Sequence, residues 1–274
     1  MTLKTQQRYK SANGLAYFKT GTGAPIVLIH GVGLRAEAWL NQVPVLSQQH
    51  TVYAIDMPGH GESALLAQDD AGLEEYVDAI ADWIKTEIEE PVIMVGHSMG
   101  SMIALNFAIR YKALCAGVAA LNSVYRRTPQ AKQAVQQRAL DMLENPALDK
   151  VTTPVLRWFN QNPQGFEKQM AELCKQWLLA APATGYARAY QIFSQNDGPR
   201  DDELAALDIP VIFITGDGDS NSSGQMSERM AALCANGSYA VIAESRHMVP
   251  MTHPEEINPL LAEFVQQCGI QTRR

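Results

Sequence analysis

Short, almost continuous apolar runs recur along the chain and set its pattern. They occupy residues 26–29, 52–55, 92–95, 118–121, 211–214 and 239–242. Runs of this kind predict strands that are buried on both faces of a sheet. Helical patterns lie between most of them, as at Tyr76, Ile80 and Trp83. This alternation predicts a mostly parallel sheet with helices on both sides, and residues 4–19 predict an antiparallel hairpin that turns at Asn13-Gly14.

One long gap breaks the alternation. Between Leu121 and Val211 the apolar positions follow four helical stripes, which begin near Val135, Val151, Phe166 and Tyr186. A single crossover between parallel strands needs only one helix and two short loops. We therefore predict a helical cap at residues 123–195, inserted between core segments 1–122 and 196–274. Its aromatic stripes predict packing between cap helices, with the lining of a substrate pocket as the alternative.

Composition narrows the range of functions. The 274 residues suit one large domain or a domain with a sizeable insertion, and the net charge of −7 argues against binding to nucleic acid or to anionic membranes. There is no run of 18 apolar residues and no apolar leader at the N-terminus, so we expect a cytoplasmic protein. The irregular spacing of the four cysteines predicts reduced thiols rather than metal ligands or disulfides. We expect a monomer or a homodimer.

The candidate chemistry begins at Ser98. The apolar run 92–95 leads directly into Gly96-His97-Ser98-Met99-Gly100, and a helical pattern follows. This is the strand–turn–helix context that a G-x-S-x-G nucleophile elbow requires. The serine then projects at a helix N-terminus, where amide N–H groups point toward developing negative charge.

A serine hydroxyl needs a base, and in this arrangement the acid and then the histidine follow the serine along the chain. The run 211–214 is followed by Gly216-Asp217-Gly218-Asp219, and the run 239–242 is followed by His247. The carboxyl ends of parallel strands lie at the same edge of a sheet, so these groups are expected to meet Ser98. Asp217 and Asp219 are both candidates for the acid.

At this point the chain resembles the α/β-hydrolase superfamily, from about residue 21 to residue 264 without the cap. The motifs that carry the resemblance are HGVG at 30–33, DMPGHGES at 56–63, GHSMG at 96–100 and GDGD at 216–219. The resemblance implies an α/β-hydrolase fold with a mostly parallel eight-stranded sheet. It also selects Asp219 rather than Asp217 as the acid. Some relatives place the acid after the preceding strand, where this chain has Asn122, which cannot be anionic.

The resemblance also implies the roles. Ser98 attacks a carbonyl carbon, His247 takes the proton and returns it to the leaving group, and Asp219 orients His247. The backbone N–H groups of Val32 and Met99 form the oxyanion hole. Structural roles are expected for the loop histidines His30, His60 and His97 and a surface position for His253. Tyr125, Arg126 and Arg127 open the predicted cap as a solvated face or, as the alternative, meet an acidic group of the substrate.

The function expected from these features is hydrolysis of a small-molecule carboxylic ester or lactone through an acyl-enzyme on Ser98. The resemblance points to the branch that includes enol-lactone hydrolases. Cleavage of a carbon–carbon bond next to a carbonyl and acyl transfer to another acceptor are alternatives, and a non-catalytic ligand receptor is the alternative from another class. The partner is expected to be a small acyl substrate, and the sequence contains no phosphate loop, dinucleotide fingerprint or metal-ligand cluster that would imply a cofactor or metal.

Overall fold

The computed structural model describes residues 6–144 and 151–269. Its single eight-stranded sheet has the strand order β1-β2-β4-β3-β5-β6-β7-β8. In chain order the strands are β1 (Tyr9–Lys10), β2 (Ala16–Thr20), β3 (Pro25–Ile29), β4 (Thr51–Ile55), β5 (Val92–His97), β6 (Cys115–Leu121), β7 (Val211–Gly216) and β8 (Gly237–Ile242). All pairings from β4 to β8 are parallel, and β2 pairs antiparallel with β1 and β4. The predicted mostly parallel eight-stranded fold is thus confirmed.

The N-terminal strands form the hairpin that Asn13-Gly14 predicts. Tyr9 lies opposite Tyr17 in the antiparallel register, and Gly14 has a φ of +84°, which a glycine adopts without strain. Residues 4 and 5 of the predicted hairpin lie outside the described residues.

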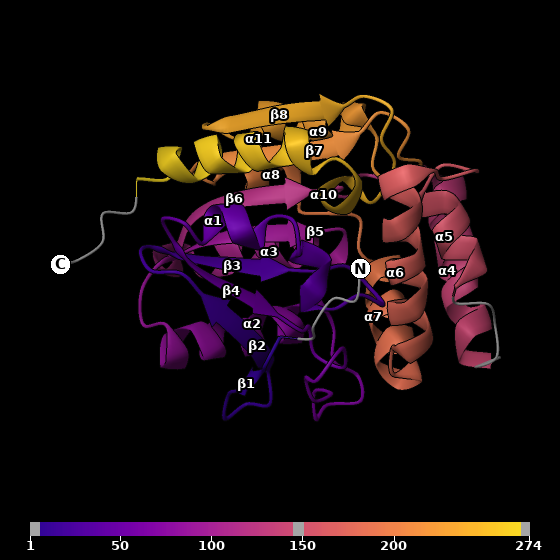
Figure 1. The fold of residues 1–274 in the computed structure, drawn as a ribbon, viewed down its shortest axis with the longest axis horizontal. Helices are drawn as coiled ribbons and strands as arrows, with labels where there is room; N and C mark the ends of the chain where they lie inside the picture. The colour runs from indigo at the N-terminus through magenta and orange to yellow at the C-terminus, as the bar shows by residue number, and fades with distance from the viewer. Residues whose placement is uncertain (1–5, 145–150, 270–274) are drawn as a thin grey trace.

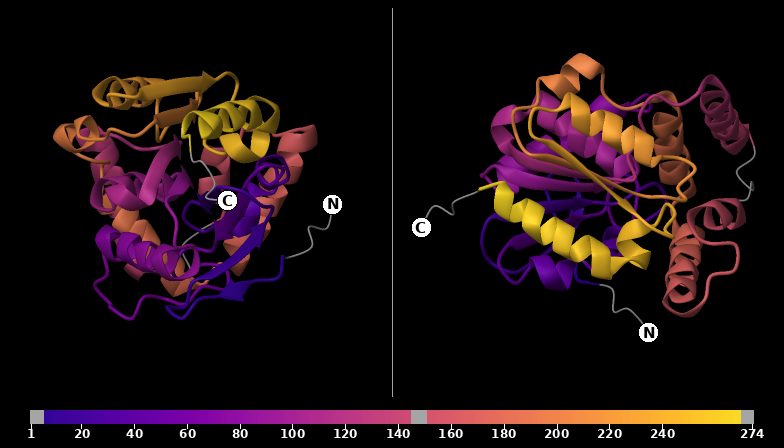
Figure 2. Two further views of the ribbon diagram at one scale, coloured as in Figure 1. Left: turned by 90° about the vertical axis from the view of Figure 1, so that its left-hand side faces the viewer. Right: turned by 90° about the horizontal axis from the view of Figure 1, so that it is seen from above.

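Helices cover both faces of the sheet (Figures 1 and 2). One face packs against α2 (Leu73–Glu87), α3 (Met99–Arg110) and α9 (Gly224–Leu233), through side chains such as Phe107. The other face packs against η1 (Ala36–Trp39), α1 (Val43–Leu46) and α11 (Pro254–Gln267), through side chains such as Trp39 and Phe264. The remaining core elements are η2 (Lys112–Leu114), α8 (Asp201–Ala205) and α10 (Val249–Thr252).

The strand β8 differs from the prediction of a strand buried on both faces. It forms the edge of the sheet, and the side chains of Tyr239 and Val241 are 47% and 42% exposed. An apolar run alone does not distinguish an edge strand from a central one, because β-branched and aromatic residues favour both positions.

Between β6 and α8 the described residues form four helices that gather at one end of the sheet, beyond the tips of the parallel strands (Figure 1). They are α4 (Pro129–Glu144), α5 (Thr152–Trp158), α6 (Gly165–Ala180) and α7 (Ala183–Gln195). Each corresponds to one of the four apolar stripes, although Leu143 and Phe166 are 48% and 43% exposed. Within the described part of the chain, no helix is long and apolar enough to span a membrane.

Candidate active site

The loop at Ser98 joins β5 to α3 by a turn too tight for side chains at its glycines. Ser98 has φ 55° and ψ −120°, a left-handed conformation that is strained for a residue with a side chain. A Cβ at Gly96 would lie 2.2 Å from the carbonyl oxygen of Gly100, and a Cβ at Gly100 would lie 2.2 Å from that of Ile29. Both glycines are therefore required for strand and helix to approach so closely. The turn leaves Ser98 at the N-terminus of α3, with its side chain lining a cavity.

The structure brings Ser98, Asp219 and His247 together from three separate loops. His247 Nε2 lies 3.0 Å from Ser98 Oγ, and His247 Nδ1 lies 2.8 Å from Asp219 Oδ2. Because a carboxylate only accepts hydrogen bonds, Nδ1 carries the proton and Nε2 is left to accept from the serine hydroxyl. Asp219 and His247 are 5% and 2% exposed, so little water screens this pair.

The loop between β7 and α9, residues 217–223 and called the acid loop below, holds Asp219 as an anion. Its carboxylate accepts hydrogen bonds from the Asn221 N–H at 2.8 Å, from Ser222 Oγ at 2.5 Å and from Asn122 Nδ2 at 2.8 Å. Burial alone would raise the pKa of Asp219, but the interaction with His247 and the hydrogen bonds from Ser222 and Asn221 hold that pKa well below its usual range. Asn122 occupies the position at which some relatives have the acid, and here it donates a hydrogen bond to Asp219.

Asp217, the competing candidate, points elsewhere. Its side chain is exposed, and its Oδ1 accepts a hydrogen bond of 3.3 Å from the Ser245 N–H. No hydrogen bond or ion pair joins it to His247 among the described residues.

The main chain of the HGVG loop, residues 30–33, lies beside Ser98. A Cβ at Gly31 would lie 3.0 Å from Ser98 Cβ, which brings this loop against the nucleophile. Val32 and Met99 are both buried, and neither N–H donates to another backbone group among the described residues. These two donors are therefore available to an oxygen bound beside Ser98.

Two buried histidines hold this loop by hydrogen bonds. His30 Nε2 accepts from the Met57 N–H at 2.9 Å, and His60 Nε2 accepts from the Gly33 N–H at 3.0 Å. Accepting at one ring nitrogen requires the neutral imidazole. Burial lowers the pKa of His30 to about 3 and that of His60 to about 4, in agreement with that state. The third loop histidine, His97, donates from Nε2 to the carbonyl oxygen of His247 at 2.8 Å, and burial lowers its pKa to about 3.

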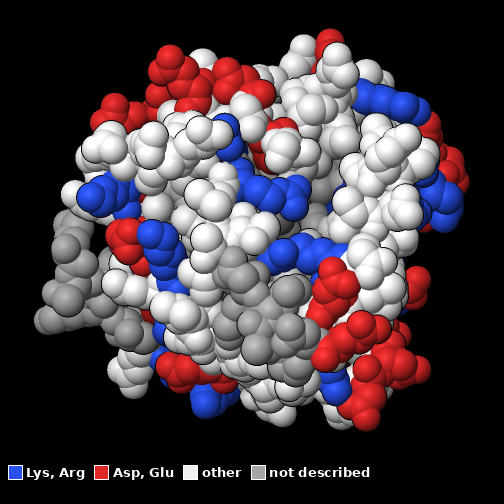
Figure 3. Space-filling view, turned by 90° about the vertical axis from the view of Figure 1, so that its right-hand side faces the viewer, with Lys and Arg blue, Asp and Glu red and all other residues white. Residues whose placement is uncertain are grey.

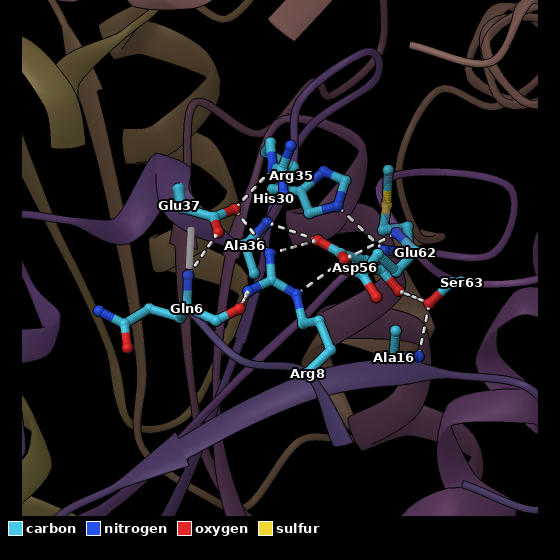
Figure 4. A network of polar contacts seen from close by, with 11 residues as sticks. Gln6, Arg8, Ala16, His30, Arg35, Ala36, Glu37, Asp56, Glu62 and Ser63 are labelled. Atoms are coloured by element: carbon cyan, nitrogen blue, oxygen red, sulfur yellow. Dashed lines mark hydrogen bonds and ion pairs between the residues drawn. The ribbon is translucent and has the colours of Figure 1, made fainter. Parts of the chain in front are cut away.

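A buried network of ion pairs and hydrogen bonds joins Arg8 to Glu37 and Asp56 (Figure 4). The Arg8 guanidinium lies between two carboxylates, with Nε 2.9 Å from Asp56 Oδ2 and Nη2 2.6 Å from Glu37 Oε2. Asp56 also accepts from the N–H groups of Ala36 and Glu62, at 2.8 and 3.0 Å. The N-terminal segment is thereby tied to η1 and to the DMPGHGES loop, residues 56–63.

A cavity of about 300 Å³ opens above Ser98 and His247. Its walls come largely from α4, α5 and α7 and include Trp158, Tyr190 and Phe193. The centres of the Trp158 and His247 rings lie 5.9 Å apart, so part of the predicted cap packs beside the site. In the described residues, no group of three His, Cys, Asp or Glu side chains is arranged to hold a metal ion.

The structure separates the basic residues at the start of the predicted cap. Arg126 and Tyr125 both bond to Asp201 Oδ1 at 2.6 Å and do not line the cavity, whereas Arg127 lines it. Two further cavity arginines, Arg138 and Arg157, escaped the sequence analysis. They lie on helices whose recognisable signal is the spacing of apolar residues, and that spacing carries no information about where cations point.

Fold and site define a hydrolase of the α/β class, and the comparisons agree. The model of the alpha/beta hydrolase family matches residues 26–260, and the chain belongs to this family. The chain is 40% identical to an (E)-2-((N-methylformamido)methylene)succinate hydrolase of Acinetobacter baylyi, over 91% of this chain and 93% of that protein. It is 25% identical to 3-oxoadipate enol-lactonase 1 of the same organism, over 88% of each chain.

Among solved structures, a thermophilic esterase from Thermogutta terrifontis, solved with malate bound, superposes with a TM-score of 0.85. It is 26% identical, and the match covers 97% of this chain and all of that one. The family and these relatives show that the chain is a hydrolase.

Proposed function

We propose that this protein cleaves a small-molecule carboxylic ester or lactone through an acyl-enzyme on Ser98. The observation that carries the proposal is the continuous hydrogen-bonded chain from Ser98 Oγ through His247 to Asp219, with steps of 3.0 and 2.8 Å, at the floor of a cavity. A serine paired with a base that is oriented by a third group is the signature of an activated nucleophile.

The reaction follows from this arrangement. Ser98 Oγ attacks the carbonyl carbon while its proton moves to His247 Nε2, and the N–H groups of Val32 and Met99 stabilise the tetrahedral oxyanion. The intermediate collapses, and the leaving alkoxide takes the proton from Nε2. Water then attacks the acyl-enzyme by the same route and releases the acid and the free serine. Asp219 stays ionised throughout and stabilises the imidazolium.

Amide cleavage is a second candidate, and one observation favours it. The relative that is 40% identical is named for a succinate that carries an N-methylformamido group, which is an amide. The same nucleophile and oxyanion hole serve an amide, provided that His247 protonates the departing nitrogen. That relative's compound and the malate bound to the thermophilic esterase are both dicarboxylates, which supports a substrate that carries carboxylates.

The test combines labelling with turnover. We expect a fluorophosphonate probe to label the wild-type protein at one site and p-nitrophenyl acetate to show a burst of p-nitrophenol. Ser98→Ala removes both signals, and Ser47→Ala, a serine beside α1 and away from the cavity, retains them. Labelling that persists in Ser98→Ala contradicts the proposed nucleophile.

A substrate panel then separates the reaction types. It contains esters, enol-lactones, N-formyl amides and diketones with a cleavable carbon–carbon bond, each with and without an added alcohol acceptor. We expect the highest kcat/KM among the esters and lactones, with the free acid as the product. Faster cleavage of the amides or diketones would contradict the proposal, as would an acylated acceptor as the main product.

A further inference from the structure

The cavity above Ser98 has a charge opposite to that of the whole protein. The chain has a net charge of −7, yet its described cavity lining contains Arg127, Arg138 and Arg157 and no Asp or Glu. Figure 3 looks onto the face formed by α4–α7, where basic side chains gather near the middle and most acidic ones lie toward the edge. A cavity lined by one sign of charge in low-dielectric walls attracts ligands of the opposite sign.

Arg127 is already neutralised within the protein. Its Nη1 lies 2.7 Å from Asp197 Oδ1 and also donates to the Asn196 carbonyl oxygen, and its guanidinium stacks on Phe193. The side chain is only 6% exposed. Arg127 therefore braces the wall between the start of α4 and the end of α7.

Arg157 lies on α5 next to Trp158, whose ring faces His247. Its Nη2 donates to Asn221 Oδ1, and the Asn221 N–H in turn donates to Asp219. No carboxylate of the described residues lies within ion-pair distance of Arg157. Its position on the acid-loop side of the cavity places a cation near the reacting centre without pairing it to the catalytic acid.

Arg138 reaches the same region from a different helix, α4. Its guanidinium carbon lies 5.9 Å from the centre of the Tyr190 ring, which is part of the cavity wall. Burial raises the pKa of Tyr190, while the charges of Arg138, Arg157 and Arg127 act in the opposite direction, so all three cations lie close enough to affect one hydroxyl. Two guanidinium groups from two helices thus line the same cavity, and that of Arg138 lies beside Tyr190.

We propose that Arg138 and Arg157 bind a carboxylate of the substrate, so that the preferred substrate is an acyl compound with an anionic carboxylate away from the bond that is cleaved. The proposal rests on the proposed hydrolase function. A guanidinium matches a carboxylate in shape and donates two parallel hydrogen bonds, and two of them fix both its position and its direction. Such a pair favours an anionic substrate over its neutral analogue at the level of binding.

The experiment compares substrates that differ only in charge. Monomethyl and dimethyl esters of succinate, glutarate and adipate are hydrolysed at low ionic strength, and the ratio of kcat/KM for half-ester over diester is measured. We expect the wild-type protein to prefer the half-ester. Arg138→Gln and Arg157→Gln each lower the ratio by about tenfold or more, mainly through KM, since a hydrogen bond to a charged group contributes about that much.

The matched control is Arg126→Gln, which removes an equal charge from the same segment but not from the cavity lining. We expect this variant to keep the wild-type ratio. Two results would overturn the carboxylate site while leaving the hydrolase proposal intact. One is an equal kcat/KM of the wild-type enzyme for diesters and half-esters, and the other is a preference for half-esters that the arginine variants retain.

A binding measurement separates the two proposals and does not depend on turnover. Glutarate is titrated by calorimetry into Ser98→Ala protein, alone and combined with Arg138→Gln or Arg157→Gln. We expect binding that weakens with added salt and falls about tenfold or more with either arginine variant. Glutarate binding without any ester turnover by the wild type would refute the hydrolase reaction and retain the site. No binding at millimolar glutarate would refute the site.

Discussion

At the scale of single residues, the site depends on the groups that surround Asp219. Three donors from the protein and the Nδ1–H of His247 converge on one buried carboxylate. Thr215, at the end of β7, stabilises the loop that carries Asp219, because its Oγ1 donates to the Ser222 carbonyl oxygen at 2.7 Å. This arrangement keeps Asp219 ionised, although its burial opposes a charge.

Replacing Asn122 tests that arrangement by a near-isosteric change. Asn122→Asp puts a second carboxylate where an amide now donates to Asp219 Oδ2 at 2.8 Å. Two such carboxylates cannot both ionise, so one acquires a raised folded-state pKa and binds a proton more tightly than in the unfolded chain. We expect the variant to unfold more easily than the wild type by about 3 kcal/mol at pH 8, and by less at pH 5. Urea unfolding at the two pH values measures this difference.

The control is Asn122→Ala, which removes the donor without adding a charge. Its destabilisation, about 1–2 kcal/mol, should be nearly the same at both pH values. A deficit of Asn122→Asp that does not shrink as the pH falls would contradict the account given for Asp219.

Residue-scale features were predictable from the sequence only where the signal is local. Ser98 stands in a five-residue motif between a strand and a helix, and His247 follows the last strand, so both could be found. The donors to Asp219 come from the end of β6 and from the acid loop, about 100 residues apart. Only the parallel order of β6 and β7 brings them together, and no sequence pattern encodes that proximity.

At the scale of elements, α7 packs against the DMPGHGES loop by backbone contact. A Cβ at Gly185 would lie 1.8 Å from the carbonyl oxygen of Gly59. The glycine therefore sets how closely the helix approaches the core, and with it the position of Tyr186 and Tyr190 in the cavity wall.

Gly185→Ala should accordingly reverse the usual effect of this substitution in a helix. Alanine in a helix interior ordinarily stabilises by about 1 kcal/mol relative to glycine. Here the added methyl group overlaps backbone, so we expect a loss of about 1–3 kcal/mol and a higher KM for the substrate. Thermal unfolding and steady-state kinetics measure the two effects. Thr184→Ala, an exposed position on the same turn, should change neither, and a stabilised Gly185→Ala would refute the close contact.

The N-terminal segment is joined to η1 by Arg8, which is a second contact between elements (Figure 4). Arg8→Met leaves the carboxylates of Asp56 and Glu37 buried with their main cation removed. Loss of one partner from a buried ion pair costs about 3–5 kcal/mol, and we expect a destabilisation of that size in urea unfolding. Arg35 also pairs with Glu37 at 2.6 Å, but it is 23% exposed. Arg35→Met should therefore cost less than about 1 kcal/mol, and equal losses would contradict a special role for Arg8.

Elements were more predictable than their surroundings. The apolar runs located the strands, and the apolar stripes with a 3.6-residue period located α4–α7. A helix or strand that buries one side repeats its apolar residues at the period of its own geometry. The edge position of β8 and the polar faces of α4 and α5 were not predictable, since periodicity reports only the side that packs. Arg138 and Arg157 lie on the polar faces of α4 and α5, which the apolar period does not indicate.

At the scale of the whole molecule, layers of helices on both sides of the sheet bury several ionisable groups in their neutral form. His30, His60 and His97 are at most 2% exposed, and burial lowers their pKa values to about 3, 4 and 3. His30 and His60 accept hydrogen bonds in this neutral form, and His97 donates one to the His247 carbonyl oxygen, so each of them holds a loop at the site. Loop geometry and acid stability are therefore linked.

This linkage predicts how stability depends on pH. The unfolded chain binds a proton at each histidine near pH 6.5, whereas the folded chain resists protonation until about pH 4 or below. The unfolded state then holds more protons throughout this window, so stability is greatest above pH 6.5 and falls as the pH decreases. Each histidine contributes about 1.4 kcal/mol per pH unit, and the three together set a limit near 4 kcal/mol per unit.

Urea unfolding from pH 7.5 to pH 5 measures the slope. His60→Asn should reduce the slope by the contribution of one proton, about 1.4 kcal/mol per pH unit. Stability that is flat across this range would mean that the folded protein binds these protons as readily as the unfolded chain. The roles of His30 and His60 as hydrogen-bond acceptors from the Met57 and Gly33 N–H groups do not allow that.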